Sequence, residues 1–289
     1  MRLESLWALT VTFNPPLSDG RLEEQVRQVA SQGIGHLLVD NGSANARDIR
    51  VLAARHHRPD CPVIVLELGR NVGLGGALNA GVRECRTRFG ARWILTMDQD
   101  TFFGPDAFSA ADRELASIDF HEPVAIVAFN YLEHRRNRER PYNHGSGPVE
   151  VNSMITSGSI VNASLFDHVT FDERLFLYFV DVDFCHKVRR LGRRIWVLRS
   201  AFIDHQEGRR VVRDGRPYFF LEPPRLYFVA RNGCWIFRRY WSVKSLIVVS
   251  YLVAMNFFND ISPGRSLYEA ARGAIASMFP DRFPPPRIG

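Results

Sequence analysis

Lysine is nearly absent from this sequence. Only Lys187 and Lys244 occur among its 37 basic side chains, so arginine carries almost all of the positive charge. The 31 acidic side chains leave a formal net charge of +6. Because a guanidinium group pairs with two oxygen atoms at once, such a surplus suits phosphate groups or an anionic membrane surface. A coding bias toward arginine explains it equally well, and the sequence leaves both interpretations open.

Cysteine is scarce as well, and no CxxC pair occurs. The four cysteines are scattered through apolar or helical stretches: Cys61, Cys85, Cys185 and Cys234. This spacing argues against a disulfide framework or a zinc module, and we expect buried free thiols in a reducing compartment. The N-terminal residues 1–13 (MRLESLWALTVTF) enter a strand-like pattern without a small-residue cleavage site. We therefore expect no secretory signal and a cytoplasmic location.

No apolar run is long enough to predict a membrane-spanning helix. Residues 245–259 (SLIVVSYLVAMNFFN) carry no formal charge, but a span needs about 20 apolar residues. We expect a buried or interfacial helix there, within a helical tail that begins near Pro223. The composition, 46% hydrophobic and 24% charged, is typical of a folded globular protein and excludes a disordered chain.

Apolar strands alternate with helical stretches through the first hundred residues. Strands are expected over 6–13, 36–40, 63–68 and 93–97, and helices over 21–32, 44–56 and 74–89. Nearly all-apolar strands separated by helices are typical of a parallel sheet covered on both faces. Right-handed crossovers place the strand ends Phe13, Asp40, Leu68 and Asp98 along one edge, where open α/β sheets bind ligands.

Beyond residue 100 the pattern is less regular. Strands are expected over 124–130, 149–156 and 194–198, a turn at 157–159, a helix over 181–191, and a solvated loop over the basic run 133–144.

Two carboxylates directly follow an apolar strand in Asp98-Gln99-Asp100. Carboxylates this close repel each other and are costly to desolvate unless a cation lies beside them. A divalent metal that also bridges nucleotide phosphates would neutralise both. A solvated turn with two incidental acids is the alternative, because Asp-x-Asp is common.

Two other strands end in polar turns. In Asp40-Asn41-Gly42-Ser43, the Asp40 carboxylate is placed to accept from a base or ribose. Residues 70–76 (RNVGLGG) open a helix, and such a glycine-rich start brings backbone amides close to a phosphate. A plain tight turn is the alternative. Leu78 stands where the dinucleotide fingerprint requires a third glycine, which argues against a nicotinamide enzyme.

Asp181 and His205 complete the set of candidate residues. Asp181 follows an aromatic run at the start of the helix expected over 181–191; it either caps that helix or serves as a general base. His205 comes just past the next expected strand and could complete a metal shell with Asp100, although a lone histidine is more often structural.

Taken in order, these segments resemble the inverting glycosyltransferases of family two, and most closely their bacterial rhamnosyltransferase branch. The resemblance covers roughly residues 7–235 and rests on 11–14, 39–43, 71–73, 98–101, 156–158, 181–183, His205, 225–227 and 231–232. It implies an α/β GT-A fold, a Rossmann-like, mostly parallel sheet flanked by helices, with a C-terminal helical extension. The implied catalytic domain spans 1–222, with a nucleotide-binding half 1–100 and an acceptor half 101–222, and the extension 223–289 would associate with a membrane.

The resemblance also implies roles for individual residues. The nucleotide sugar would be held by Phe13, Asn14, Asp40, Asn41, Arg70, Asn71, Gly75, Asp98 and Gln99. Mg²⁺ or Mn²⁺ would be held by Asp98, Asp100 and His205; the sugars would contact Ser157, Gly158, Tyr178 and Asp183. Asp181 matches the catalytic base. The family's preceding acid is Val180 here, so a helper role would fall to another residue such as Asp183.

The implied reaction is transfer of L-rhamnose from dTDP-L-rhamnose to a saccharide, carried on a lipid, at the inner face of a bacterial cytoplasmic membrane. Another UDP or dTDP sugar stays open as donor, and so does a homodimer. No nucleic-acid partner is expected, because no reader motif is present.

Two competing functions have weaker support. A sugar nucleotidyltransferase resembles a pattern with a glycine-rich, basic loop after its first strand, where this chain has Asn14-Pro15-Pro16. A membrane-surface scaffold could use the basic tracts 134–140 and 209–216 on anionic lipid, although solvated faces explain those tracts more simply.

Overall fold

The computed structural model describes residues 3–117, 124–132, 142, 145–205, 209–213, 216–259, 263–279 and 284–286. Its contacts define two compact units. The first comprises Met1–Glu173 and Phe184–Gln206, and the second comprises Arg174–Asp183 and Glu207–Gly289. The division at 222/223 expected from the sequence stays a prediction.

The strands are β1 (Leu6–Thr12), β2 (Gly35–Asp40), β3 (Val63–Glu67), β4 (Trp93–Asp98), β5 (Thr101–Phe103), β6 (Val124–Leu132), β7 (Val149–Glu150), β8 (Ser159–Asn162), β9 (Arg194–His205), β10 (Arg209–Arg213) and β11 (Arg216–Phe220). The α-helices are α1 (Arg21–Ala30), α2 (Ala46–His56), α3 (Gly73–Thr87), α4 (Ala107–Leu115), α5 (Val180–Arg190), α6 (Pro223–Tyr240), α7 (Val243–Asn259) and α8 (Pro263–Ala276). Short 3-10 helices lie at Leu17–Asp19, Ala163–Asp167 and Glu173–Leu175.

The first unit contains a mixed sheet of nine strands, with the order β3-β2-β1-β4-β8-β6-β9-β5 and β7 paired to β9. Its first four strands are parallel, and their register pairs Thr12 with Asp40 and Val11 with Asp98. The carboxyl ends of these strands therefore share one edge. The parallel half predicted from alternating strands and helices is confirmed.

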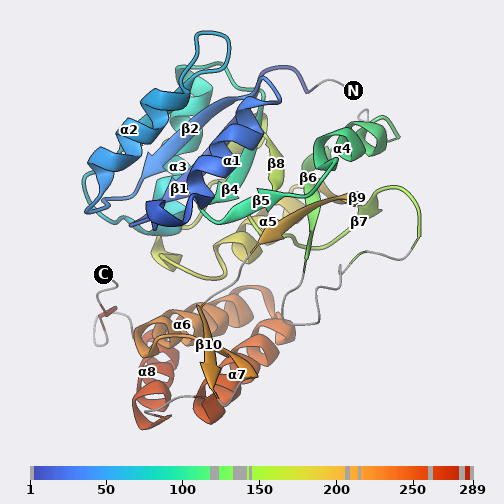
Figure 1. The fold of residues 1–289 in the computed structure, drawn as a ribbon. Coiled ribbons are helices and arrows are strands. Elements are labelled where there is room, and N and C mark those ends of the chain that lie inside the picture. Colours follow the sequence, from blue (N-terminus) through green and yellow to red (C-terminus); the bar gives the residue numbers. More distant parts are fainter. Residues whose placement is uncertain are drawn as a thin grey trace. The chain divides into compact units, whose positions relative to one another are not determined.

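Helices cover both faces of this parallel half (Figure 1). On one face, Leu22 and Val26 of α1 pack with Leu38 of β2 in a buried cluster. On the other face, α3 approaches so closely that a Cβ at Gly81 would lie 2.7 Å from Val39. Successive residues of β2 thus point to opposite faces and meet different helices, which explains why that strand is apolar throughout.

The other half of the sheet contains a bulge that aims the end of β9. Between the pairs Phe129–Leu198 and Asn130–Phe202 the register of β6 against β9 shifts, so residues 199–201 are extra in β9. The buried carboxylate of Glu114 in α4 accepts from the backbone N–H groups of Arg199, at 2.8 Å, and Ser200, at 2.6 Å. After the bulge, β9 continues through His205 and pairs with β5.

Two local expectations need correction. The strand expected over 149–156 is only Val149–Glu150, and the next strand, β8, begins at Ser159. The chain turns at Gly158, whose φ of 74° is left-handed, so the intervening residues do not continue a ladder. His205 lies at the end of β9 rather than past it, because β9 runs through the bulge. Most of the expected loop 133–144 and the whole basic tract 134–140 lie outside the described residues.

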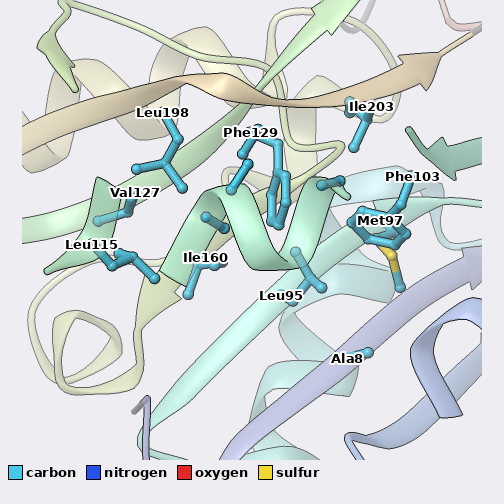
Figure 2. Close-up of a cluster of buried hydrophobic side chains, with 14 of the residues drawn as sticks. Ala8, Leu95, Met97, Phe103, Leu115, Val127, Phe129, Ile160, Leu198 and Ile203 are labelled. Atoms are coloured by element: carbon cyan, nitrogen blue, oxygen red, sulfur yellow. The ribbon is translucent and has the colours of Figure 1, made fainter. Parts of the chain in front are cut away.

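The main core of the first unit lies beneath α4 (Figure 2). Phe129 of β6, Ile160 of β8 and Leu95 of β4 are each at most 3% exposed there. Small residues of α4, including Ala110 and Ala111, let the helix approach the sheet closely. This packing supports β4, whose end carries the candidate acidic site.

The described part of the second unit contains helices α6, α7 and α8 and the strands β10 and β11. Leu226 of α6, Leu252 of α7 and Ala270 of α8 share a buried cluster, and β10 pairs antiparallel with β11. The sequence did not predict this hairpin. None of the described helices is both long and apolar enough to cross a bilayer.

All four cysteines are free, as expected. Burial raises the pKa of the Cys85 thiol to about 12, so this group stays an uncharged core side chain at neutral pH. Cys234 is half-buried rather than buried.

Candidate functional site

Asp98 ends β4 at the carboxyl edge of the parallel strands, and buried hydroxyl groups hold its carboxylate. The hydroxyl of Ser157 donates to Oδ2 of Asp98 at 2.5 Å. The Thr101 hydroxyl in turn donates to Ser157 Oγ at 3.2 Å. Ser157 and Thr101 are both fully buried. The arrangement fixes the Asp98 side chain before any ligand binds.

The backbone around Asp98 is held by a second set of buried polar side chains. The side-chain amide of Gln25 in α1 donates to the carbonyl oxygens of Asp98, at 2.7 Å, and Thr101, at 2.9 Å. Its Oε1 accepts from the Thr10 hydroxyl at 2.8 Å, so that hydroxyl must accept from Nε2 of His36, also at 2.8 Å. Every hydrogen bond in this series therefore has a defined direction.

The His36 ring is uncharged in this series of hydrogen bonds. The ring is 1% exposed, and burial lowers its pKa from 6.5 to about 3. A neutral ring that donates through Nε2 leaves Nδ1 as an acceptor, and Nδ1 is buried without a hydrogen-bond partner among the described residues. His36 is thus a structural group at neutral pH.

The polar turn after β2 is tied to the end of β1. Asp40, 1% exposed, accepts from the Ser43 N–H through both carboxylate oxygens, each at 3.2 Å. The Asn14 side chain accepts from the Ala44 N–H at 2.8 Å, and Asn14 N–H donates to Ser43 Oγ at 2.9 Å. Asn14 and Asp40, both expected to hold the nucleotide sugar, therefore lie in one connected set of loops.

The turn after β2 also contacts the turn after β3. Asn41 donates to Oδ1 of Asn71 at 3.0 Å and accepts from the Val72 N–H at 2.9 Å. Gly42, with φ of 82°, brings the two turns into contact, because a Cβ there would lie 2.5 Å from the Arg70 carbonyl carbon. Asn41 and Asn71 thus hold each other, which accounts for their side chains without a nucleotide.

Three further residues assigned to the nucleotide lie around this edge. Gln99 accepts from the Phe13 N–H at 2.8 Å and so ties the acidic turn to β1. Arg70 is exposed. Gly75 is buried in the first turn of α3, where an added Cβ would lie 3.0 Å from the Asp172 carbonyl oxygen.

Gly158, assigned to a sugar, holds strands together. Its N–H donates to Thr96 at 2.8 Å, and its carbonyl accepts from Phe129 at 2.9 Å. It therefore joins β4 to β6 beside Ser157.

The register of β5 and β9 brings His205 to the acidic turn. His205 is paired with Thr101, the residue after Asp100; its side chain is not among those described. Among the side chains that are described, no three His, Cys, Asp or Glu residues gather into a metal site by themselves. Carboxylate oxygens suit Mg²⁺ or Mn²⁺, which commonly complete their shell with water and substrate phosphates. The donor set therefore fits a cation shared with a bound diphosphate.

Asp181 belongs to the second unit, so its convergence with Asp100 stays a prediction. It lies in the first turn of α5, half-buried, and its Oδ1 accepts from the Val182 N–H at 2.8 Å. Asp183 is fully buried and accepts from the Tyr240 hydroxyl at 2.7 Å. Tyr178 is half-buried among the apolar side chains of α6 and α8.

Gln25 escaped the sequence analysis. Thr101 and Asn232 lie in segments that carry the family resemblance, but the sequence assigned neither of them a role; Asn232 contacts the segment before Asp181. For Gln25 a signal existed, because it shares the apolar face of α1 with Leu22, Val26 and Val29. A polar side chain on a buried helical face must find partners. Which partners it finds is not encoded in the spacing.

Comparisons with known proteins agree with this fold. The model of the family Glycosyl transferase family 2 matches residues 9–197. The dTDP-rhamnosyl transferase RfbF of Shigella flexneri is 25% identical over 252 residues, which are 81% of this chain and 80% of that protein.

Two solved structures share the architecture. The mannosyltransferase PcManGT from Pyrobaculum calidifontis, in complex with GDP-Man and Mn²⁺, has a TM-score of 0.56 at 16% identity, over 95% of this chain and 75% of that one. S. aureus TarS 1–349 in complex with UDP-GlcNAc has a TM-score of 0.53 at 16% identity, over 96% and 73%. At these identities the likeness shows the fold alone, which is the mixed α/β GT-A fold.

Proposed function

Because this chain belongs to glycosyl transferase family 2, we propose that it is an inverting enzyme that transfers L-rhamnose from dTDP-L-rhamnose to a lipid-linked saccharide. The observation that carries the proposal is the Asp98 carboxylate, held by Ser157 at the carboxyl edge of the parallel strands. Family membership makes glycosyl transfer the activity. The choice of donor rests on the name of the Shigella relative.

The donor lies along the sheet edge in this proposal. Asp40 and Asn14 belong to the connected turns after β2 and β1 and are assigned to the nucleoside, and Arg70 is exposed to pair with phosphate. Asp98, Asp100 and His205 would hold a divalent cation. When bound, it would supply positive charge that stabilises the diphosphate leaving group.

Asp181 acts as the general base. A sugar hydroxyl is a weak nucleophile until its proton is removed, and Asp181 takes that proton as the oxygen attacks the anomeric carbon. The new C–O bond forms on the face opposite the breaking bond to the diphosphate. The nucleoside diphosphate departs with the bonding electron pair, and the anomeric configuration inverts in one step.

A bilayer-bound acceptor agrees with the surface of α7. Val243, Ile247 and Tyr251 lie four residues apart on one face and are 61%, 62% and 50% exposed. An apolar helical stripe of this kind suits contact with the interfacial region of a membrane. Flotation with vesicles of anionic lipid tests this placement: the protein should float with the vesicles, and Ile247→Glu should reduce that fraction.

A donor panel tests the function. The protein is incubated with a lipid-linked or free saccharide and each of dTDP-L-rhamnose, UDP-GlcNAc and GDP-mannose, with and without Mn²⁺. We expect release of dTDP from the first donor alone, in a metal-dependent manner. Release of UDP or GDP instead would replace the donor, whereas production of free pyrophosphate would favour a sugar nucleotidyltransferase.

The base is tested separately. Asp181→Asn removes the proton acceptor with little change of shape, so transfer should fall by about 10²–10⁴-fold while the dissociation constant for dTDP stays within a few fold. Asp60→Asn, on the exposed turn before β3, is the matched control and should transfer normally. Normal turnover by Asp181→Asn would show that another group is the base.

A further inference from the structure

The segment that leads into Asp181 has an unusual backbone. Phe176, Tyr178 and Phe179 have φ of 51°, 64° and 60°, in the left-handed region. Residues with a bulky side chain rarely adopt this conformation, because the Cβ crowds the carbonyl oxygen. Such strain persists only where surrounding contacts enforce it, and it is concentrated at functional sites. The contacts that enforce it here come from α6.

One buried asparagine donates hydrogen bonds to three backbone carbonyls of this segment. Nδ2 of Asn232 donates to the carbonyl oxygens of Leu175, at 2.5 Å, Leu177, at 2.6 Å, and Tyr178, at 3.0 Å. Asn232 is fully buried. The left-handed residues turn these three oxygens toward one point, where they would repel each other without a donor between them. A primary amide places two N–H groups at that point.

The orientation of this amide is itself determined by its neighbour. Nε of Arg231 donates to Oδ1 of Asn232 at 2.9 Å, so the NH₂ group faces the three carbonyls. Nη2 of Arg231 donates to the Arg174 carbonyl oxygen at 2.6 Å. Two consecutive residues of α6 thus hold the chain from residue 174 to residue 178.

Helix α6 holds the other side of Asp181 as well. The Tyr240 hydroxyl donates to Oδ1 of Asp183, two residues after Asp181. The start of α5 is therefore fixed by hydrogen bonds both before and after Asp181. Asp181 itself is half-buried, so its supporting contacts need not block the carboxylate.

We propose that Asn232 is a positioning residue for glycosyl transfer: by holding residues 175–178 in their strained turn, it sets where α5 begins and where the Asp181 carboxylate is presented. This role rests on the proposed function, because it assumes that Asp181 is the base. An apolar side chain at position 232 would remove the amide donor that the three converging carbonyls share and would leave the Leu175 carbonyl with the Leu177 N–H alone. A carboxylate there would add a negative charge to them.

A matched pair of asparagines separates positioning from general stability. Asn256 in α7 is also buried in the second unit; its amide donates to Leu221 O at 2.9 Å and Ser266 Oγ at 3.0 Å, remote in sequence from 174–183. Asn232→Ala should lower kcat by about 10²-fold, the cost of misplacing a reacting group, with KM for the nucleotide sugar within threefold. Asn256→Ala should lower thermal stability and leave kcat within threefold. Equal kcat values in the two variants would overturn the proposal.

Hydrogen–deuterium exchange supplies a readout that does not depend on activity. In Asn232→Ala, the backbone amides of 174–183 should exchange at least tenfold faster than in Asn256→Ala. Equal exchange rates in the two variants would show that Asn232 does not hold this segment. If Asn232→Ala does not fold, Asn232→Ser retains one donor and should show smaller changes in the same direction. Normal transfer by Asp181→Asn together with faster exchange in Asn232→Ala would show that Asn232 holds residues 175–178 but that Asp181 is not the base.

Discussion

The side-chain amide of Gln25 donates to the Asp98 carbonyl oxygen at 2.7 Å, linking the first helix to the backbone of a residue 73 positions later in the chain. The same amide reaches Thr101 O, so it spans the acidic turn. The position of the acidic turn 98–101 therefore depends on helix α1 through the Gln25 side chain.

Gln25→Leu should weaken binding of nucleotide with Mn²⁺ by about 10-fold, because loss of an outer partner that orients a ligating group typically costs 10–100-fold. Gln28 offers a matched control: it lies one turn later in α1 and bonds Phe103 N and O, at 3.0 and 3.1 Å, farther along β5. Gln28→Leu should lose similar stability and keep nucleotide affinity. Titration calorimetry with dTDP and Mn²⁺ measures both, and equal affinities in the two variants would contradict this role of Gln25.

Ser157→Ala removes the donor to the Asp98 carboxylate. The carboxylate then loses its fixed orientation, so the Mn²⁺ concentration that gives half-maximal transfer should rise by about 10-fold. Ser159→Ala is the control, because that buried hydroxyl donates to Ile155 O and does not touch Asp98. The measurement is a Mn²⁺ titration of initial rates. A similar change in both variants would mean that the sheet, rather than the acidic site, was disturbed.

Gly42→Ala should destabilise the protein and weaken nucleotide binding together. Its φ of 82° disfavours any side chain, and the new Cβ would meet backbone atoms of Arg70 at 2.5 and 2.6 Å. Gly33 also has a left-handed φ, of 66°, but an added Cβ there would have nothing within 4 Å. We expect Gly33→Ala to cost about 1–2 kcal/mol and Gly42→Ala clearly more, from urea unfolding. Equal losses would show that the two turns can separate without penalty.

Burial of neutral His36 makes the first unit sensitive to acid. Its folded pKa is about 3, against 6.5 in the unfolded chain, so between these values only the unfolded state binds the proton. Stability from this group is therefore complete above pH 6.5 and is lost as pH falls toward 3.

His36→Asn should be less stable than the unaltered protein at pH 7.5 but should lose less additional stability between pH 6.5 and 4. His168→Asn changes an exposed ring and should keep the original pH dependence. Urea midpoints at several pH values compare the three proteins. An unchanged slope in His36→Asn would assign the acid sensitivity to other groups.

Much of the sheet edge could be predicted because it depends on the local periodicity of strands and helices. Short apolar strands that alternate with stretches of helical periodicity indicate a parallel sheet, and parallel strands bring their carboxyl ends to one edge. Asp40 and Asp98 are placed correctly at that edge because each stands at the carboxyl end of such a strand. The irregular half was harder, since the bulge at residues 199–201 depends on Glu114 reaching across from another helix.

By itself, the sequence determined which residues end the parallel strands and which polar types stand there, because strand and helix periods are properties of neighbouring residues. Only the tertiary structure decided what holds them: the amide of Gln25 beneath Asp98 and the amide of Asn232 among the carbonyls before Asp181. Those contacts join residues more than fifty positions apart, and a buried polar group finds its partner through the packing of whole elements rather than through any local signal.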